Sequence, residues 1–260
     1  MKNKITINSL LELKRKGEPI SALTAYDYFT ASFLDTAGVD IILIGDSLEM
    51  VIYGAENTLT ATMDKMLFHT QAVAKAVEHA LIVADMPFLS FQTTISEAVQ
   101  NAGKFLQAGA NAVKIEGGWK YAAAVRAMTD AGIPVMGHIG MLPQSVNKIG
   151  GYITQGADED TAQALLHDAS LIQEEGAFAI VLEKVFPDTA KRITASLEIP
   201  TIGIGSGPHC DGQILVVNDI LGLFDRFTPP FVKKYADLKS EIINAAKAYI
   251  ADVKSKKYPQ

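Results

Sequence analysis

The chain has 260 residues, of which 48% are hydrophobic and 20% charged, and its formal net charge is −6 at pH 7. This balance is typical of a globular protein and excludes an intrinsically disordered chain. The acidic charge, without a basic stripe, argues against a nucleic-acid partner. The single cysteine, Cys210, excludes an internal disulfide. With no signal-peptide pattern and no apolar stretch near the ~18 residues of a membrane helix, we expect a cytoplasmic protein without membrane contact.

The predicted elements alternate between helices and strands. A helix over residues 6–16 comes first, with Ser9 and Glu12 as its expected capping box and Gly17 as its stop. Short apolar segments then predict eight strands, at 20–24, 41–44, 81–84, 112–115, 134–137, 178–182, 201–204 and 214–217. Alanine-rich segments of helical periodicity lie between them, for example 66–79, 96–107 and 161–174. Apolar residues at helical spacing predict a long amphipathic helix at the C-terminal end, over 231–253.

Three helix–strand junctions share a glycine, at Gly38, Gly109 and Gly176. A left-handed glycine can end a helix and turn the chain directly into the next strand. Eight strand–helix units, in a chain near the ~250 residues usual for the fold, favour a (β/α)₈ TIM barrel. The first unit lacks G-x-G-x-x-G, which weakens the alternative of a dinucleotide-binding open sheet. We therefore predict one TIM-barrel domain over residues 1–260, with an N-terminal helix and a long C-terminal helix.

Three of the apolar runs end in an acid, at Asp46, Asp85 and Glu116. Because parallel strands share one direction, these carboxylates should gather at one face of the sheet. Clusters of oxygen donors suit hard divalent cations such as Mg²⁺. A single Asp after a strand is more often a helix N-cap, but neither Asp46 nor Asp85 precedes an obvious helix start. The sequence therefore predicts a metal site at the carboxyl ends of the strands, where TIM barrels build their active sites.

Other polar residues fall at the same ends of the predicted strands. Lys114 lies two positions before Glu116, so both side chains should point to one side of their strand. A lysine in an apolar strand needs a partner, and either a carboxylate or an anionic substrate would serve. Glu183 is interpreted as a catalytic residue or as the ion-pair partner of a nearby lysine. His138 is equally consistent with a ligand contact and a structural role. The glycine-rich 203–207 loop could bind phosphate, as in many barrels, but without a nearby Lys or Arg it favours a tight turn with close backbone approach.

Eight motifs occur in the order found in one known family: Gly45-Asp-Ser-Leu48, Ala84-Asp-Met-Pro-Phe88, Val113-Lys-Ile-Glu-Gly-Gly118, Gly137-His-Ile-Gly140, Pro143-Gln-Ser-Val-Asn147, Gly150-Gly-Tyr152, Val181-Leu-Glu183, and Gly203-Ile-Gly-Ser-Gly207 with Cys210-Asp-Gly-Gln213. Together they closely resemble the ketopantoate hydroxymethyltransferase family, from about residue 6 to 255. The resemblance implies transfer of a hydroxymethyl group from 5,10-methylenetetrahydrofolate to 3-methyl-2-oxobutanoate. The product would be 2-dehydropantoate (ketopantoate), in the first committed step of pantothenate biosynthesis.

The resemblance also assigns roles to individual residues. It implies one Mg²⁺ ion per subunit, with the ligands Asp46, Asp85 and Glu116. It implies a ketoacid site formed by Asp46, Ser47, Asp85 and Lys114, and a proton acceptor at Glu183. It implies a homo-oligomer, and specifically a homodecamer, because family members typically form decamers. No residue is assigned as the acid that opens the folate ring, and His138 is only a candidate.

This chain departs from the family pattern near the site. Glu49, Leu142 and Lys184 stand where glycine, threonine and cysteine are usual, and the 57–62 stretch lacks the usual proline. These changes flank the matched chemistry and affect the expected loop shape and folate affinity more than the reaction.

Two other functions remain open from the sequence. One is a Mg²⁺-dependent oxoacid lyase or mutase of the phosphoenolpyruvate mutase–isocitrate lyase type, although its Lys-Lys-Cys-Gly-His motif is absent here. The other is a catalytically inactive barrel that binds metabolites or takes part in an assembly. The retained acids and Lys114 argue against the second.

Overall fold

Eight parallel strands form one closed barrel, in the order β1 to β8. The computed structural model describes residues 4–151, 153–227 and 229–259. The strands are β1 Ile20–Thr24, β2 Ile41–Ile44, β3 Leu81–Asp85, β4 Ala112–Glu116, β5 Val135–Gly140, β6 Ala179–Glu183, β7 Thr201–Ile204 and β8 Gly212–Leu215. The predicted TIM-barrel fold, with its N-terminal and long C-terminal helices, is confirmed.

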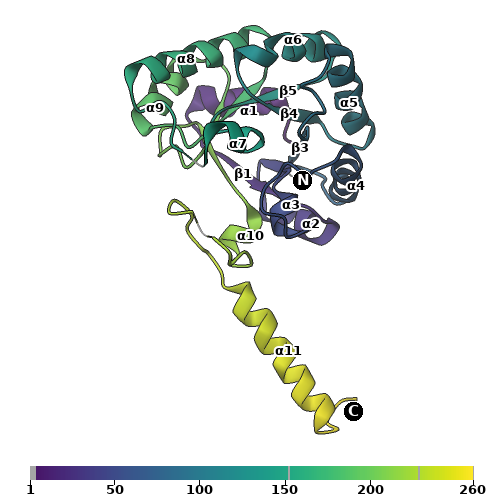
Figure 1. Ribbon diagram of the computed structural model, residues 1–260. Helices are drawn as coiled ribbons and strands as arrows, with labels where there is room; N and C mark the ends of the chain where they lie inside the picture. Colours follow the sequence, from purple (N-terminus) through teal and green to yellow (C-terminus); the bar gives the residue numbers. More distant parts are fainter. Residues whose placement is uncertain (1–3, 152, 228, 260) are drawn as a thin grey trace. The chain divides into compact units, whose positions relative to one another are not determined.

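The helices that connect the strands lie around them, as Figure 1 shows. The longer helices of the chain are α1 Ile7–Lys16, α2 Tyr28–Ala37, α4 Met63–Ala74, α5 Ile95–Gln107, α6 Ala122–Asp130, α8 Glu159–Glu174, α9 Pro187–Ser196 and α11 Leu238–Lys254. Short helical turns are α3 Leu48–Val51, η1 Trp119–Tyr121, η2 Pro143–Ser145, α7 Val146–Ile149 and α10 Val217–Ile220. Gly38, Gly109 and Gly176 have φ of 92°, 106° and 94°, which confirms the predicted left-handed helix–strand junctions.

Three helix predictions differ from the structure, because capping and not apolar spacing sets where a helix begins. The helix predicted over 66–79 spans Met63–Ala74, after its N-cap Thr62. The α1 capping box joins Thr6 to Ser9, so the predicted pair of Ser9 and Glu12 is wrong. The C-terminal helix begins at Leu238 instead of residue 231, since the Asp237 side chain accepts a hydrogen bond from the Ser240 N–H. None of the α11 side chains is buried.

The eighth strand was predicted two residues too late. It spans Gly212–Leu215, and the helix α10 begins at Val217. A Cβ added at Gly212 would lie 2.5 Å from the Ile20 carbonyl oxygen of β1, so only glycine allows this approach. The apolar pattern missed Gly212 because the requirement at that position is space for the neighbouring backbone.

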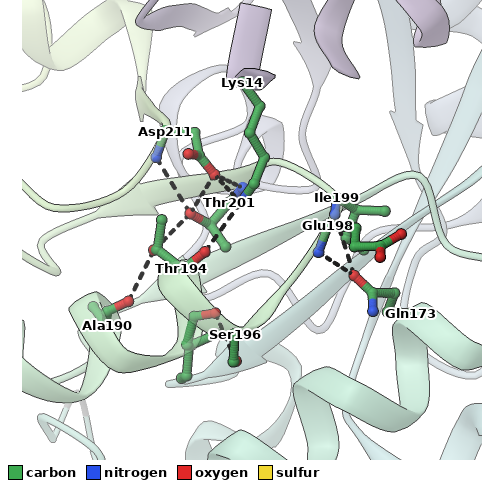
Figure 2. A network of polar contacts seen from close by, with 10 residues as sticks. Lys14, Gln173, Ala190, Thr194, Ser196, Glu198, Ile199, Thr201 and Asp211 are labelled. Carbon is green, nitrogen blue, oxygen red and sulfur yellow. Dashed lines mark hydrogen bonds and ion pairs between the residues drawn. The ribbon is translucent and has the colours of Figure 1, made fainter. Parts of the chain in front are cut away.

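The helix α1 packs against the barrel strands, and its last turn takes part in a polar network. Leu10 is fully buried in a core cluster with strand residues such as Ile20, Leu43 and Val83. Lys14, in the last turn of α1, donates hydrogen bonds to the Asp211 carboxylate (2.9 Å) and to the Thr194 carbonyl (3.1 Å). Figure 2 shows this network at the starts of β7 and β8.

Asp35, in the last turn of α2, anchors the loop that leads into β3. Its carboxylate accepts backbone hydrogen bonds from Glu78 (3.0 Å), His79 (3.1 Å) and Ala80 (2.7 Å). Burial raises the pKa of Asp35, but the hydrogen bonds from Ala80, Glu78 and His79 outweigh burial and lower it. This carboxylate is therefore stabilised in its charged form by the fold itself.

The contacts within the chain divide it into two compact units, up to Ile214 and from Leu215 onward. The first unit contains nearly the whole barrel, and the second contains α10 and α11. The single domain predicted over residues 1–260 stays a prediction. Among the described residues, no helix combines the length and the hydropathy needed to span a membrane.

Candidate active site

Three buried carboxylates meet at the carboxyl ends of neighbouring strands, as the sequence predicted. Asp46 follows β2, and Asp85 and Glu116 are the last residues of β3 and β4. Each residue is 3–4% exposed. The backbone N–H of Asp46 donates a hydrogen bond to Asp85 Oδ2 (3.1 Å), which fixes the first two acids against each other.

Lys114 provides positive charge within this cluster. Its Nζ lies 2.7 Å from Asp85 Oδ1, and its side chain is 5% exposed. Burial, with the charges of Asp85 and Glu116, raises the pKa of Asp46 well above its ordinary value. Burial also raises the pKa of Asp85, although Lys114 opposes this. The carboxylates outweigh burial at Lys114 and raise its pKa, so the lysine is charged.

Gln144, from the loop after β5, joins two of the acids. Its side-chain Nε2 donates to Asp46 Oδ2 (3.0 Å), and its backbone N–H donates to Glu116 Oε2 (3.0 Å). The residue is 6% exposed. Its string Pro143-Gln-Ser was part of the family pattern, but no residue-level signal gave Gln144 a role. A loop glutamine acquires this position only through the tertiary structure.

His138 on β5 lies between Glu116 and Glu183. Its Nδ1 is 3.5 Å from Glu116 Oε1, and its Nε2 is 3.3 Å from Glu183 Oε2. Burial and the Lys114 ammonium lower the pKa of His138, but the two glutamates outweigh them and raise it to about 9. The Lys114 Nζ also lies 3.2 Å from His138 Nδ1, so two glutamates and a lysine surround the buried ring. Glu183 therefore forms an ion pair with His138, a residue on the neighbouring strand.

Glu183, at the end of β6, is more accessible than the other acids. Its side chain is 17% exposed, whereas those of Asp85 and Glu116 are each 4% exposed. Next to it on β5, Gly140 has φ of 97°, and an added Cβ would lie 2.3 Å from the Glu183 carbonyl oxygen. Only glycine therefore allows β5 to approach the end of β6 this closely.

Ser47 also lies beside the acids. A Cβ added at Gly45 would be 2.6 Å from Ser47 Oγ and 3.5 Å from Asp85 Oδ2, so both groups flank the same glycine. The Ser47 hydroxyl is 2.9 Å from the Tyr26 hydroxyl, which comes from the residues after β1. Tyr26 is 2% exposed and was not among the predicted site residues. Its hydroxyl contact orients the Ser47 side chain.

Glu49, one of the departures from the family pattern, is paired within the fold. Its carboxylate binds Lys65 Nζ at 2.8 Å and accepts a hydrogen bond from Thr60 (2.7 Å). The side chain of Glu49 is 2% exposed. This acid therefore joins the segment around Thr60 to α4.

The donor chemistry of the cluster fits a hard divalent cation. In the described part of the chain, no group of three or more His, Cys, Asp or Glu side chains is placed so that it could hold a metal ion. However, the raised pKa values of Asp46 and Asp85 indicate an excess of buried negative charge. Asp85 Oδ1 has the Lys114 ammonium beside it but no well-directed hydrogen bond. A cation bound by these oxygens would offset that excess.

Comparison with known proteins identifies the family. The model of the family described as ketopantoate hydroxymethyltransferase matches residues 4–260. The chain belongs to this family. It is 54% identical over 257 residues to the 3-methyl-2-oxobutanoate hydroxymethyltransferase of Syntrophus aciditrophicus, covering 98% of this chain and 94% of the relative. The enzyme of that name from Pyrococcus furiosus is 51% identical over 255 residues, covering 98% of this chain and 89% of the relative.

Solved structures resemble the barrel at much lower identity. A phosphonopyruvate hydrolase complex with oxalate and Mg²⁺ superposes with a TM-score of 0.63 and 14% identity, covering 96% of this chain and 87% of that chain. A 2,3-dimethylmalate lyase of the PEP mutase/isocitrate lyase superfamily superposes with a TM-score of 0.61 and 14% identity, covering 97% of this chain and 88% of that chain. At this identity the likeness establishes the shared fold alone.

Proposed function

We propose that this chain catalyses hydroxymethyl transfer to 3-methyl-2-oxobutanoate, with 5,10-methylenetetrahydrofolate as the one-carbon donor. The observation that carries the proposal is the convergence of three buried carboxylates with Lys114, beside a more exposed Glu183. The curated relatives support it, because they carry this activity in their names at about half identity over nearly the whole chain. Their names do not specify the donor or a metal.

In this proposal Asp46, Asp85 and Glu116 hold one Mg²⁺ ion per subunit. When bound, the ion would act as a Lewis acid toward the keto oxygen of the substrate. Lys114 would pair with the anionic ketoacid and stabilise the negative charge that develops during the reaction. Ser47, oriented by Tyr26 at 2.9 Å, would donate a hydrogen bond to the substrate.

Glu183 would remove the proton from C3 of the ketoacid. Its Oε2 lies 3.3 Å from His138 Nε2, and its Oε1 would accept the proton. The partial exposure of Glu183 suits a group that must meet substrate. A positioned base of this kind typically contributes ~10²–10⁴ in rate. The deprotonated C3 would then bond to the methylene carbon of the donor, and water would supply the hydroxyl oxygen. Both bonds from that carbon to the folate nitrogens would break, and tetrahydrofolate would leave with the proton from C3 and one proton from the water.

The homodecameric assembly and the cytoplasmic location are part of the same proposal. The assembly rests on the family resemblance, and the location on the single cysteine and on the lack of a signal-peptide or membrane-helix pattern in the sequence. The alternative of an oxoacid lyase or mutase rests on fold likeness at 12–15% identity, which does not favour its chemistry over the transferase. An inactive barrel is opposed by the retained acids and Lys114.

The test is isotope exchange at C3 of 3-methyl-2-oxobutanoate in deuterated buffer, without folate. We expect exchange that requires a divalent cation and stops with chelator. Formation of ketopantoate should then require the folate. Exchange without product formation when folate is added would oppose the transferase, and cleavage or rearrangement of other oxoacids would favour the lyase or mutase. Absence of exchange at any metal concentration would contradict the proposed chemistry.

A further inference from the structure

Gln144 contacts the carboxylate cluster at two points through two different parts of the residue. Its amide Nε2 binds Asp46 Oδ2, and its backbone N–H binds Glu116 Oε2, each at 3.0 Å. Asp46 follows β2 and Glu116 ends β4, so one loop residue spans two acids that are separated along the barrel. Gln144 is 6% exposed, which keeps both hydrogen bonds away from water.

The orientation of the Gln144 amide is determined by its surroundings. Its Nε2 also donates to the Met86 carbonyl oxygen (3.0 Å), so both amide hydrogens point at oxygen acceptors. Its Oε1 accepts a hydrogen bond from Gln92 Nε2 (2.9 Å). A flipped amide would place oxygen against Asp46 Oδ2 and the Met86 carbonyl, and nitrogen against the Gln92 donor. The structure therefore admits one orientation.

Gln92 is oriented in turn by the backbone. Its Oε1 accepts a hydrogen bond from the Phe91 N–H (3.3 Å), which leaves Nε2 to donate toward Gln144. The amides thus form a directed chain that ends on Asp46. Aligned hydrogen bonds polarise one another in a buried site.

We propose that Gln144 is a positioning residue for the cation site, with Gln92 as its support. This inference rests on the proposed function, since it assumes that Asp46 and Glu116 are metal ligands. Gln144 occupies one lone-pair direction of Asp46 Oδ2 and one of Glu116 Oε2, and it fixes the rotation of both carboxylates. Partners of this kind typically change metal affinity by 10–100-fold when they are removed.

The test measures Mn²⁺ binding by the loss of the free-ion EPR signal, without any turnover. Gln144→Met keeps the length and volume of the side chain and removes its hydrogen bonds, while the backbone bond to Glu116 persists. We expect the Mn²⁺ dissociation constant to rise ~10–100-fold. Gln92→Met should raise it less, by about threefold, because Gln92 touches no carboxylate. At saturating Mn²⁺, kcat for C3 exchange should recover most of its wild-type value.

A matched control is available at the opposite side of the fold. The Gln173 Oε1 accepts hydrogen bonds from the backbone of Glu198 (2.7 Å) and Ile199 (3.2 Å), as Figure 2 shows. Gln173→Met should lower the melting temperature and leave the Mn²⁺ dissociation constant unchanged. If Gln144→Met does not fold, Gln92→Met carries the test, with the same direction of change.

A ligand variant separates this inference from the proposed function. Wild-type affinity in Gln144→Met and Gln92→Met, with weak binding in Asp46→Asn, would overturn the positioning role and leave the metal site intact. Wild-type affinity in Asp46→Asn would overturn the metal site itself, and with it the role of Gln144. An equal loss of affinity in Gln173→Met would show that the effect is general destabilisation.

Discussion

Asp35, near the start of β3, and Asp46, after β2, are both buried acids, but their partners differ. Asp35 accepts hydrogen bonds from three successive backbone N–H groups, and its pKa is lowered. Asp46 faces two further carboxylates, and its pKa is raised well above the ordinary value. The fold stabilises the charge of Asp35 and opposes that of Asp46. Carboxylates kept at such a cost are expected where a ligand will compensate them.

Asp46→Asn should give the largest effect. We expect turnover to fall by roughly three orders of magnitude, because the proposed metal ligand, and with it several kcal/mol of Lewis-acid stabilisation, would be lost. In the presence of chelator, the free energy of unfolding should stay equal or rise, since one of three clustered charges is removed. Steady-state kinetics measures the turnover, and urea denaturation measures the free energy of unfolding. A clear loss of stability with normal turnover would make Asp46 a structural acid like Asp35.

Glu183→Gln tests the accessible acid of the same cluster. It keeps the shape and removes the basicity, so ketoacid and Mn²⁺ binding should be near normal. Both C3 deuterium exchange and product formation should fall by about two orders of magnitude or more. NMR measures the C3 exchange rate and calorimetry measures ligand binding, so the loss of basicity can be separated from a loss of binding. Exchange at the wild-type rate would place the base elsewhere, with His138 as the next candidate.

Asp35→Asn should show the opposite pattern, a loss of stability with normal kcat. The asparagine amide would set N–H groups against the donors of Glu78, His79 and Ala80. We expect a loss of about 2–3 kcal/mol in the free energy of unfolding at pH 7, measured by urea denaturation.

The pH dependence of that loss gives a second measurement. A lowered folded-state pKa contributes stability above the unfolded value of ~3.9, and this is lost as pH falls through the folded pKa. The advantage of wild type over Asp35→Asn should therefore shrink below about pH 4. A difference that is constant from neutral to strongly acidic pH would show that the charge of Asp35 is not what stabilises it.

Thr201→Val should give the smallest effect. Its hydroxyl donates to Asp211 Oδ2 (3.1 Å) and lies 2.8 Å from the Thr194 hydroxyl. Valine keeps the shape, and the backbone N–H of residue 201 still binds Asp211 (2.8 Å). We expect a loss of about 1 kcal/mol by thermal unfolding, with unchanged kcat. A change in kcat would show that the two ends of the barrel are coupled.

The sequence by itself determined the barrel and most of the acids at its mouth. Strands rich in Ile and Val carry a strong local signal, and parallel strands place their final residues at one face whatever the details of packing. Asp46, Asp85, Glu116 and Lys114 could therefore be predicted to converge. The start of β8 could not, because Gly212 is required by its approach to the Ile20 carbonyl of β1.

Only the tertiary structure decided which groups each acid contacts. Gln144 and Tyr26 lie in segments without regular periodicity, so no local pattern marks them, yet they bind Asp46, Glu116 and Ser47. The partner of Glu183 is likewise a residue 45 positions earlier, His138. Hydrogen bonds between distant loops depend on side-chain direction and burial, which are set when the barrel closes. These hydrogen bonds therefore cannot be predicted from the spacing of residues along the chain.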